Sequence, residues 1–351
     1  MTLDKKYDAI IVGGGHNGLV CAFYLARAGM KTCVLELASV VGGAAITEEF
    51  YPGFSNSVAS YTVSLLQPKI IKDMALNKHG LRIVLRQVDN FLPLENGYLL
   101  AGGGGLTASE IARHSPRDAA NLPAYEAALN RVVDCVRQLL LVAPPNAGGG
   151  IGDILALLKL GKVVNGLTLE GQSDLLDFFT RSAAEILGQY FENEAVKALF
   201  GFDAVVGNFA SPYEPGSAYV LLHHVFGETN GVKGAWGHAI GGMGAITQAM
   251  RKSCEALGVD IFTDCPVTAI TRTGTRQKRI EAEKGVFSAP IVAAGVHPKI
   301  LFEQLLDPSE VPAPFKRSIA NYVSHSGTFR MNVALDQLPK FTNGPKGEAH
   351  L

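Results

Sequence analysis

The sequence predicts an α/β protein in which a domain with a parallel sheet is interrupted by a long α+β insertion. Two observations support this fold class. Residues 7–43 have the pattern of a strand, a tight glycine turn, a helix and a second strand, and a similar order of glycines, helix and short buried strands returns over residues 236–300. The stretch between them carries hairpin and helix signals instead. The chain is therefore expected to leave one domain and to re-enter it.

A glycine-rich turn follows the first predicted strand, Ala9–Val12, whose four apolar residues suit a parallel strand covered on both faces. Gly13, Gly15 and Gly18 then fit the pattern G-x-G-x-x-G. In this pattern the first glycine permits the turn, the second lets a pyrophosphate approach the backbone, and the third lets helix and strand pack closely. The pattern predicts a Rossmann-like turn that opens a helix.

An acidic residue, Glu36, ends the second predicted strand, Thr32–Leu35. Its carboxylate can accept hydrogen bonds from both hydroxyls of an adenosine ribose and would repel a 2′-phosphate. Strand, glycine turn, helix and terminal acid together predict an adenine dinucleotide site, and the alternative is a glycine-rich turn without a ligand. The spacing does not choose between NAD and FAD. The intervening helix is expected to end at Gly29 and to bury a stripe formed by Val20, Phe23, Tyr24 and Leu25.

Length and charge limit the classes of protein that this chain can represent. At 351 residues it exceeds one typical domain, so two domains are expected. The 31 Lys and Arg residues nearly balance the 32 Asp and Glu residues, which gives no electrostatic case for nucleic acid or for an anionic membrane. Hydrophobic residues make up 47%, as suits an enzyme with an apolar core. A small molecule is the expected partner.

Cysteine and histidine patterns argue against a dithiol centre and against a metal site. The five cysteines are odd in number, are scattered and contain no C-x-x-C pair, which favours a reducing compartment. Adjacent His223 and His224 point to different faces of any regular element, so no metal is expected there. Only MTLDKK precedes Tyr7, too little for a signal or transit peptide, so a cytoplasmic location is expected if the protein is bacterial.

The insertion is expected to contain a hairpin and several helices. Two apolar strands surround the hairpin signal Glu95-Asn96-Gly97. Ser115-Pro116 predicts the start of a helix that runs to about Val142, because serine suits the N-cap and proline the first helical position. Two more helices are expected over residues 151–164 and 173–187.

The helix expected over Ile151–Val164 has more apolar residues than one buried stripe requires, namely Ile154, Leu155, Leu157, Leu158 and Leu160. Ordinary core packing is the first expectation for this helix. Contact with an apolar ligand, or peripheral contact with a membrane surface, is the alternative.

The parallel-stranded domain is expected to resume near residue 236. Gly241-Gly242-Met243-Gly244 predicts the start of a helix that runs to about Leu257. Short strands are expected over residues 259–262, 266–272, 279–283, 291–294 and 326–335. The predicted organisation is a nucleotide-binding domain at 1–75 and 236–300, a substrate domain at 76–235, and an incomplete strand region of the substrate domain at 301–351.

The order of these pieces resembles a known family. Residues 8–43, with the glycine pair Gly42-Gly43 shortly after Glu36 and with Gly53-Phe54 beyond it, look like the N-terminus of the phytoene desaturase and amine oxidase superfamily of FAD enzymes. GGMGAITQAM, DIFTDCPVTAI and IVAAG look like its second FAD-binding segment. The segment GGAAITEEFYPGFSNSVASYTVSLLQP is most similar to the pyridine nucleotide-disulphide oxidoreductase domain-containing protein two subgroup. The resemblance covers essentially the whole chain and implies a Rossmann-like FAD-binding domain of the GR2 type, interrupted by an α+β substrate domain.

The resemblance also implies roles for individual residues. Gly13, Gly15 and Gly18 would hold the FAD pyrophosphate, and Glu36 would hold its adenosine ribose. The remaining cofactor contacts would come from Gly42 and Gly43 beside the cofactor, from the backbone of Val267 at the adenosine, and from Gly242 and Gly244 near the flavin. Many relatives have arginine directly after the glycine pair, where this chain has Ala44. Family members continue beyond Leu351 with a third FAD segment, so the chain is expected to be a fragment.

The implied function is that of a dehydrogenase, desaturase or amine-oxidase-like enzyme, which moves a hydride from an apolar or amine-like substrate to flavin, with dioxygen or a quinone as electron acceptor. No side chain is an obvious general base, so catalytic residues are left unassigned. A non-catalytic dinucleotide-binding regulator acting through a respiratory-chain protein is a second hypothesis, and the same subgroup resemblance implies the mitochondrial matrix as the alternative location. An ordinary NAD dehydrogenase is disfavoured by the long insertion and by the second glycine pair.

Overall fold

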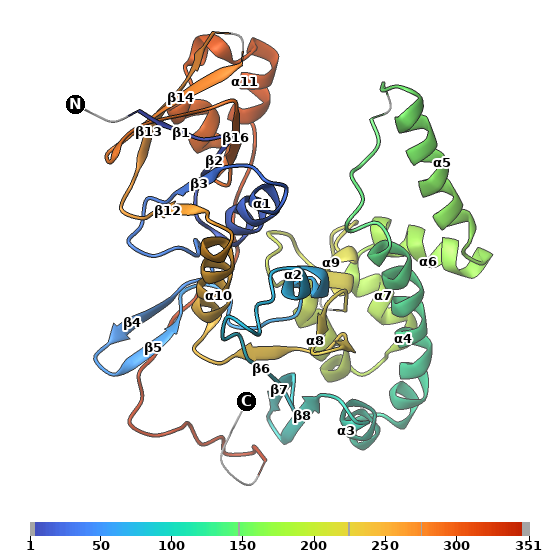
Figure 1. The fold of residues 1–351 in the computed structure, drawn as a ribbon. Helices are drawn as coiled ribbons and strands as arrows, with labels where there is room; N and C mark the ends of the chain where they lie inside the picture. Colours follow the sequence, from blue (N-terminus) through green and yellow to red (C-terminus); the bar gives the residue numbers. More distant parts are fainter. Residues whose placement is uncertain (1–3, 147, 224, 275, 346–351) are drawn as a thin grey trace. The chain divides into compact units, whose positions relative to one another are not determined.

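The computed structural model describes residues 4–146, 148–223, 225–274 and 276–345, and these fall into two compact units (Figure 1). Unit 1 comprises Met1–Val84 and His238–Ser324, and unit 2 comprises Leu85–Gly237 and His325–Leu351. The chain thus leaves unit 1 and returns to it. The sequence predicted domain boundaries after residues 75 and 235, which lie close to two of the boundaries between these units. Residues 301–324 were predicted to belong to the substrate domain, but they pack in unit 1.

Unit 1 combines strands and helices from both of its chain segments. In chain order they are β1 Asp4–Lys6, β2 Ala9–Val12, α1 His16–Arg27, β3 Thr32–Leu35, β4 Thr47–Tyr51, β5 Phe54–Ser57, α2 Pro68–Asp73, β6 Ile83–Leu85, β11 Gly237–Ala239, α10 Met243–Ala256, β12 Asp260–Phe262, β13 Val267–Thr273, β14 Gln277–Ala282, β15 Gly285–Ala289, β16 Ile291–Ala294, the π-helix η2 Ile300–Leu305, the 3₁₀ helix η3 Pro308–Glu310 and α11 Ala313–Ala320. Strands β6 and β11 include the residues where the chain crosses between the units.

Unit 2 is mainly helical. Its elements are β7 Asn90–Leu94, β8 Gly97–Ala101, α3 Leu106–His114, α4 Pro116–Arg137, α5 Ile151–Asn165, α6 Leu169–Thr180, α7 Ala183–Tyr190, α8 Glu194–Gly201, the 3₁₀ helix η1 Phe202–Ala204, α9 Tyr219–His223, β9 Glu228–Thr229 and β10 Val232–Lys233. Their apolar side chains form a separate core that includes Leu99, Tyr125, Val132, Phe178 and Leu222.

The central sheet of unit 1 is parallel and has the strand order β12-β3-β2-β16. Its strands are short and apolar because both of its faces are covered. Alternate residues of β2 and β3 point to opposite faces: Ile11 and Val34 join the core beneath α1 and α10, whereas Ile10 and Leu35 join a core on the other side. That second core packs against the sheet β1-β15-β14-β13. This arrangement is a Rossmann-like layer structure, as predicted.

Several local predictions are confirmed. Strands β7 and β8 form an antiparallel hairpin in which Leu94 faces Gly97. The Ser115 hydroxyl accepts a hydrogen bond from the Asp118 amide at 3.1 Å, and Pro116 is the first residue of α4, although this helix ends at Arg137 and not near Val142. Gly29 has the positive φ of 87° expected just beyond α1.

The buried face of α1 is rotated relative to the predicted stripe. Its fully buried apolar side chains are Leu19, Ala22 and Phe23, while the other three predicted residues, Val20, Tyr24 and Leu25, are half-buried. The difference arises because α1 packs against both the sheet and α10, a helix far away in sequence.

Two other predicted elements are wrong. The helix expected over residues 173–187 is split, because Ser182 and Glu185 form a capping box that starts α7. No regular strand forms over Ser326–Leu335, all of which the structure describes. Phe329, Met331 and Val333 alternate as in a strand, but their side chains are exposed.

Helix α5 does not pack as first expected. It forms over Ile151–Asn165, close to the predicted range, but contains no buried residue. Within unit 2 it extends away from α4 and α7 (Figure 1). The prediction of ordinary core packing is therefore wrong for this helix.

Candidate dinucleotide-binding site

The candidate site lies at the carboxyl edge of the parallel sheet. Ala294, Val12, Leu35 and Phe262 are aligned across the four strands, so every strand ends at the same level. The next residues are fixed there by backbone hydrogen bonds: Gly13 donates to Leu35 at 2.8 Å, Glu36 donates to Phe262 at 2.8 Å, and Gly295 donates to Val12 at 2.7 Å. Open α/β sheets bind ligands at this edge.

The three motif glycines are required for different reasons. Gly13 has a φ of 99°, and a methyl group there would lie 3.3 Å from the Gly295 carbonyl. At Gly18 a methyl group would overlap the carbonyl oxygen of Gly13, so helix and turn can approach only without a Cβ. Gly15 differs, because its φ is −64° and a methyl group would meet only the Cα of Gly43, at 3.9 Å. The fold does not need glycine at position 15, which leaves space there for a ligand.

The N-terminus of α1 opens beside Gly15. Gly15 is the N-cap, so no side chain at this position caps the first amides of the helix. The first turn also contains no acidic residue. Since the first amides of a helix lack intrahelical acceptors and carry the positive end of its dipole, this turn favours an anionic group.

Glu36 lies beside the same turn. The buried carboxylate accepts hydrogen bonds from the Gly14 amide at 2.6 Å and from the Ala38 amide at 2.9 Å. A carboxylate has about four acceptor positions, so two remain for hydroxyl donors. The two amides fix its orientation, and its remaining acceptor positions suit the two hydroxyls of a ribose.

Gly42 and Gly43 are brought to the glycine turn. The Gly42 amide donates to the Gly14 carbonyl at 2.9 Å, and Gly42 forms an isolated β-bridge with Gly15. Both residues have positive φ, 140° and 57°. The loop after Glu36 thus runs along the turn, whereas the following Ala44 is exposed.

Val267 begins the edge strand β13, and the ladder has an irregularity between Val267 and Ala269. Two residues earlier, the Cys265 amide donates to the Glu36 carbonyl at 2.9 Å. This bond holds the start of β13 close to Glu36. The structure therefore collects Gly13, Gly15, Gly18, Glu36, Gly42, Gly43 and Val267 around one edge of the sheet.

Gly242 and Gly244 have a clear packing role. The Gly244 amide donates to the Thr47 hydroxyl and the Met243 amide to the Ser57 hydroxyl, each at 3.0 Å. A Cβ at Gly244 would lie 2.8 Å from the Thr47 nitrogen, and one at Gly242 would overlap the Thr47 hydroxyl. The first amides of α10 are thus capped by the β4–β5 hairpin. A role near the flavin remains a prediction for these two glycines.

Thr47, Ser57 and Gly14 were not singled out from the sequence. The glycine cluster at 241–244 was the available signal, since it implies that another segment approaches closely, but it does not identify that segment. A cavity of about 270 Å³ adjoins this contact and is lined by Val40, Ile46, Thr47, Gly241, Gly244, Ala245 and Gln248.

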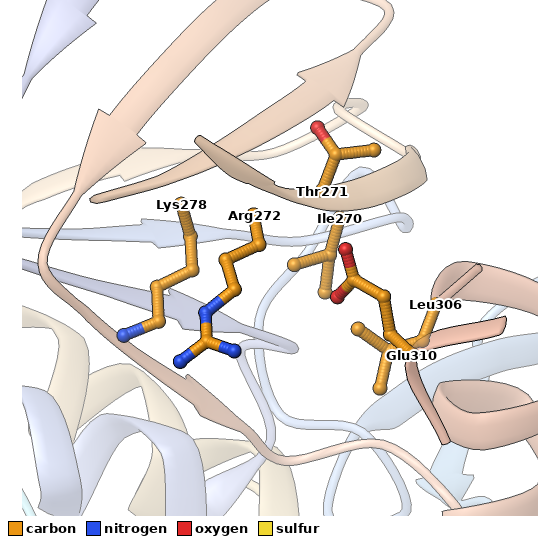
Figure 2. Close-up of a pocket in the computed structure, with 6 residues that line it drawn as sticks. All are labelled: Ile270, Thr271, Arg272, Lys278, Leu306 and Glu310. Carbon is orange, nitrogen blue, oxygen red and sulfur yellow. The ribbon is translucent and has the colours of Figure 1, made fainter. Parts of the chain in front are cut away.

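A second cavity, of about 190 Å³, is lined by none of the predicted site residues. Figure 2 shows its lining residues, among which Arg272 and Lys278 are cross-strand neighbours on β13 and β14. Lys278 already donates to the Pro290 carbonyl at 2.6 Å. No role in the candidate site follows for this cavity.

Among the residues that the structure describes, no group of three His, Cys, Asp or Glu side chains is placed to hold a metal ion, and no helix is long and apolar enough to cross a bilayer. All five cysteines are free, and burial raises the pKa of the Cys254 thiol to about 12. His224 lies outside the described residues, so the prediction that His223 and His224 bind no metal stays a prediction.

Comparisons with known proteins find relatives over most of the chain. The chain is 38% identical over 361 residues to pyridine nucleotide-disulfide oxidoreductase domain-containing protein 2 of Mus musculus, an alignment that covers 98% of this chain and 62% of that protein. It is 26% identical to phytoene desaturase (lycopene-forming) of Pantoea ananas, over 88% of this chain and 59% of the relative. The chain thus spans less than two thirds of the length of these relatives.

The fold matches those of solved amine oxidases. A putrescine oxidase superposes with a TM-score of 0.57 at 17% identity, covering 91% of this chain and 64% of the oxidase. Cyclohexylamine oxidase from Brevibacterium oxydans gives a TM-score of 0.53 at 16% identity, covering 90% and 63%. Residues 18–329 match the family described as flavin containing amine oxidoreductase. The chain therefore belongs to the flavin containing amine oxidoreductase family, whose members are flavin-dependent oxidoreductases.

Proposed function

We propose that this protein binds FAD at the carboxyl edge of the unit 1 sheet and oxidises an amine-like or apolar small molecule by transferring hydride from a C–H bond to the flavin. The observation that carries the proposal is the pairing of an open glycine turn at Gly15 with an oriented, buried carboxylate at Glu36. Together these groups suit a pyrophosphate and a ribose.

Each part of the cofactor has proposed ligands in this chain. The backbone of Gly13, Gly15 and Gly18 and the first turn of α1 would hold the pyrophosphate, and Glu36 would bind the adenosine ribose. The other proposed contacts are Gly42 and Gly43 beside the pyrophosphate, the Val267 backbone at the adenosine, and Gly242 and Gly244 on the flavin side. A 2′-phosphate would be repelled by Glu36, which disfavours NADP.

The bound flavin would supply the two-electron chemistry, so this chain's own residues bind and orient the reactants and exclude water. The capped N-terminus of α10 contributes rigidity: Thr47 accepts from Gly244 and donates to the Gly241 carbonyl, both at 3.0 Å. No catalytic side chain is proposed. Dioxygen or a quinone would reoxidise the flavin.

The test is anaerobic reduction of the bound flavin, in the chain and in a form extended to the length of the relatives. Putrescine and cyclohexylamine would serve as amine probes, and phytoene would serve as an apolar probe. Substrate-dependent loss of the flavin absorbance band supports the proposal. A tightly bound flavin that none of these probes reduces would favour the alternative, a dinucleotide-binding regulator that acts through a protein partner.

A further inference from the structure

Helix α5 differs from the other helices of the described chain. It contains no buried residue, whereas each other α-helix of eight or more residues buries at least one. Ile151, Ile154, Leu155 and Leu158 are 78%, 54%, 61% and 66% exposed. A helix on the surface of a soluble domain normally turns its apolar residues inward. Here four aliphatic side chains are more than half exposed.

These four side chains share one face. At about 100° per residue, Ile151, Ile154, Leu155 and Leu158 lie within roughly 100° of one another around the axis. The less exposed residues Ala156, Leu160 and Val163 lie on the opposite face. We call the first group the outer face of α5. Leu169, the first residue of α6, is 85% exposed as well.

Positive charge borders the outer face. Lys159 and Lys162 follow Leu155 and Leu158 by four residues each, so they lie one turn further along the same side. Within the described residues neither lysine forms an ion pair with an acidic side chain. Asp153, the one acid of α5, lies on the opposite face and accepts from the Asn146 amide at 2.9 Å.

The nearby acids of α6 do not neutralise these lysines. Glu170 and Asp174 both pair with Arg131 of α4, at 2.9 and 2.6 Å. The outer face therefore combines aliphatic side chains with two cations that have no acidic neighbour on the same face. A second copy docked through this face would bring four lysines around one apolar contact. Anionic lipid headgroups would neutralise them instead.

The length of the helix indicates how it would meet a bilayer. Fifteen residues span about 22 Å, less than the roughly 30 Å of a hydrocarbon core. We propose that α5 lies in the plane of an anionic membrane surface, with its outer face at the acyl boundary and with Lys159 and Lys162 among the headgroups. Long lysine stems allow the ammonium groups to reach the headgroups while the helix lies deeper.

Vesicle flotation tests this proposal on the full chain. Wild type should float with vesicles made of equal parts of phosphatidylcholine and phosphatidylglycerol, and less with phosphatidylcholine alone. L155Q/L158Q should bind at least tenfold more weakly to both, since each lost leucine contact is worth roughly tenfold. K159E/K162E should lose the preference for the anionic vesicles. Because all four side chains are exposed, the variants should keep the wild-type Tm.

L335Q/L338Q is the matched control, because it removes two exposed leucines from another part of unit 2, and it should float like wild type. Wild type that stays with neither vesicle, or L155Q/L158Q that floats like wild type, would overturn the proposal. Light scattering provides the rival outcome: a wild-type dimer that L155Q/L158Q dissociates, without vesicle binding, would assign the outer face to a second copy. If K159E/K162E binds anionic vesicles as tightly as wild type does, the result would contradict the choice of an anionic surface.

Discussion

Gly18 shows how a single missing side chain positions the candidate site. Any Cβ at this position would overlap the Gly13 carbonyl oxygen, which belongs to the turn that leads into α1. Gly18→Ala should therefore destabilise unit 1 by about 1–3 kcal/mol, despite the better helix propensity of alanine. Chemical denaturation measures this change. Gly188→Ala on α7, where a methyl group meets no atom within 4 Å, is the control and should leave stability unchanged or slightly raised.

Asp203 gives unit 2 a pH-dependent stability. Burial, with a smaller contribution from the Asp89 carboxylate, raises the pKa of Asp203 to about 7, from an ordinary value of about 3.9. A raised pKa in the folded state means that this contribution to stability is complete below about pH 4 and is lost as the pH rises through about 7. The loss is at most about 4 kcal/mol.

Asp203→Asn should therefore reduce the fall in Tm between about pH 5 and pH 8, because the amide cannot ionise. Thermal unfolding at several pH values measures this effect. The exposed Asp336 provides the control, and Asp336→Asn should retain the wild-type pH dependence. An unchanged pH profile in Asp203→Asn would contradict the assignment.

Sequence spacing identifies some site residues and cannot identify others. Gly13, Gly18 and Glu36 belong to a local βαβ pattern, in which turn geometry and strand ends fix their positions. Thr47 meets Gly244 across 197 residues of chain, and no local pattern contains that contact. The packing of Gly244 against the β4–β5 hairpin is visible only in the folded structure.

At the scale of elements, helix α10 begins with a cap supplied by another segment. Thr47 accepts a hydrogen bond from the Gly244 amide and donates one to the Gly241 carbonyl. Thr47→Val keeps the shape and leaves both backbone groups without this partner, so unit 1 should lose about 1–3 kcal/mol. Urea unfolding tests this, with Thr273→Val on β13 as control. Equal stability of the two variants would show that the cap contributes little.

The elements with strong local signals were predicted best. Strands β2, β3 and β16 were recognised from short apolar runs, and α10 from its glycine start. Strands β1 and β15 were missed. Strand β1 consists of Asp4, Lys5 and Lys6, which have no apolar pattern, and its parallel pairing with β15 joins segments about 280 residues apart in the sequence. The opposite error at Ser326–Leu335 has the same origin: alternation predicts a strand, but a strand also needs a partner.

The whole molecule contains separate cores for its two units. All buried residues of the clusters around the parallel sheet come from unit 1, and those of the helical cluster come from unit 2. The Ile240 amide donates to the Arg82 carbonyl at 2.9 Å, so the two chain segments of unit 1 run side by side near the crossings. A short linker can therefore replace residues 85–237.

Unit 1 rebuilt in this way, with Val84 joined to His238 by a glycine-serine linker and the chain ended at Ser324, should unfold cooperatively. Circular dichroism during heating measures the transition, and residues 85–237, the first segment of unit 2, are expressed alone for comparison. A rebuilt unit 1 that unfolds without a sigmoidal transition would show that its cores depend on the remainder of the chain.

The most direct measurement is the amount of flavin per polypeptide after gel filtration, in a form extended to the length of the relatives. Gly15→Ala is the decisive variant, because its methyl group meets only the Cα of Gly43 and so spares the fold while filling the space proposed for the pyrophosphate. Wild type and Gly188→Ala should retain FAD, while Gly15→Ala, with an unchanged Tm, should bind it at least tenfold more weakly. Equal FAD retention in Gly15→Ala, or no retained flavin in wild type, would contradict the proposed site.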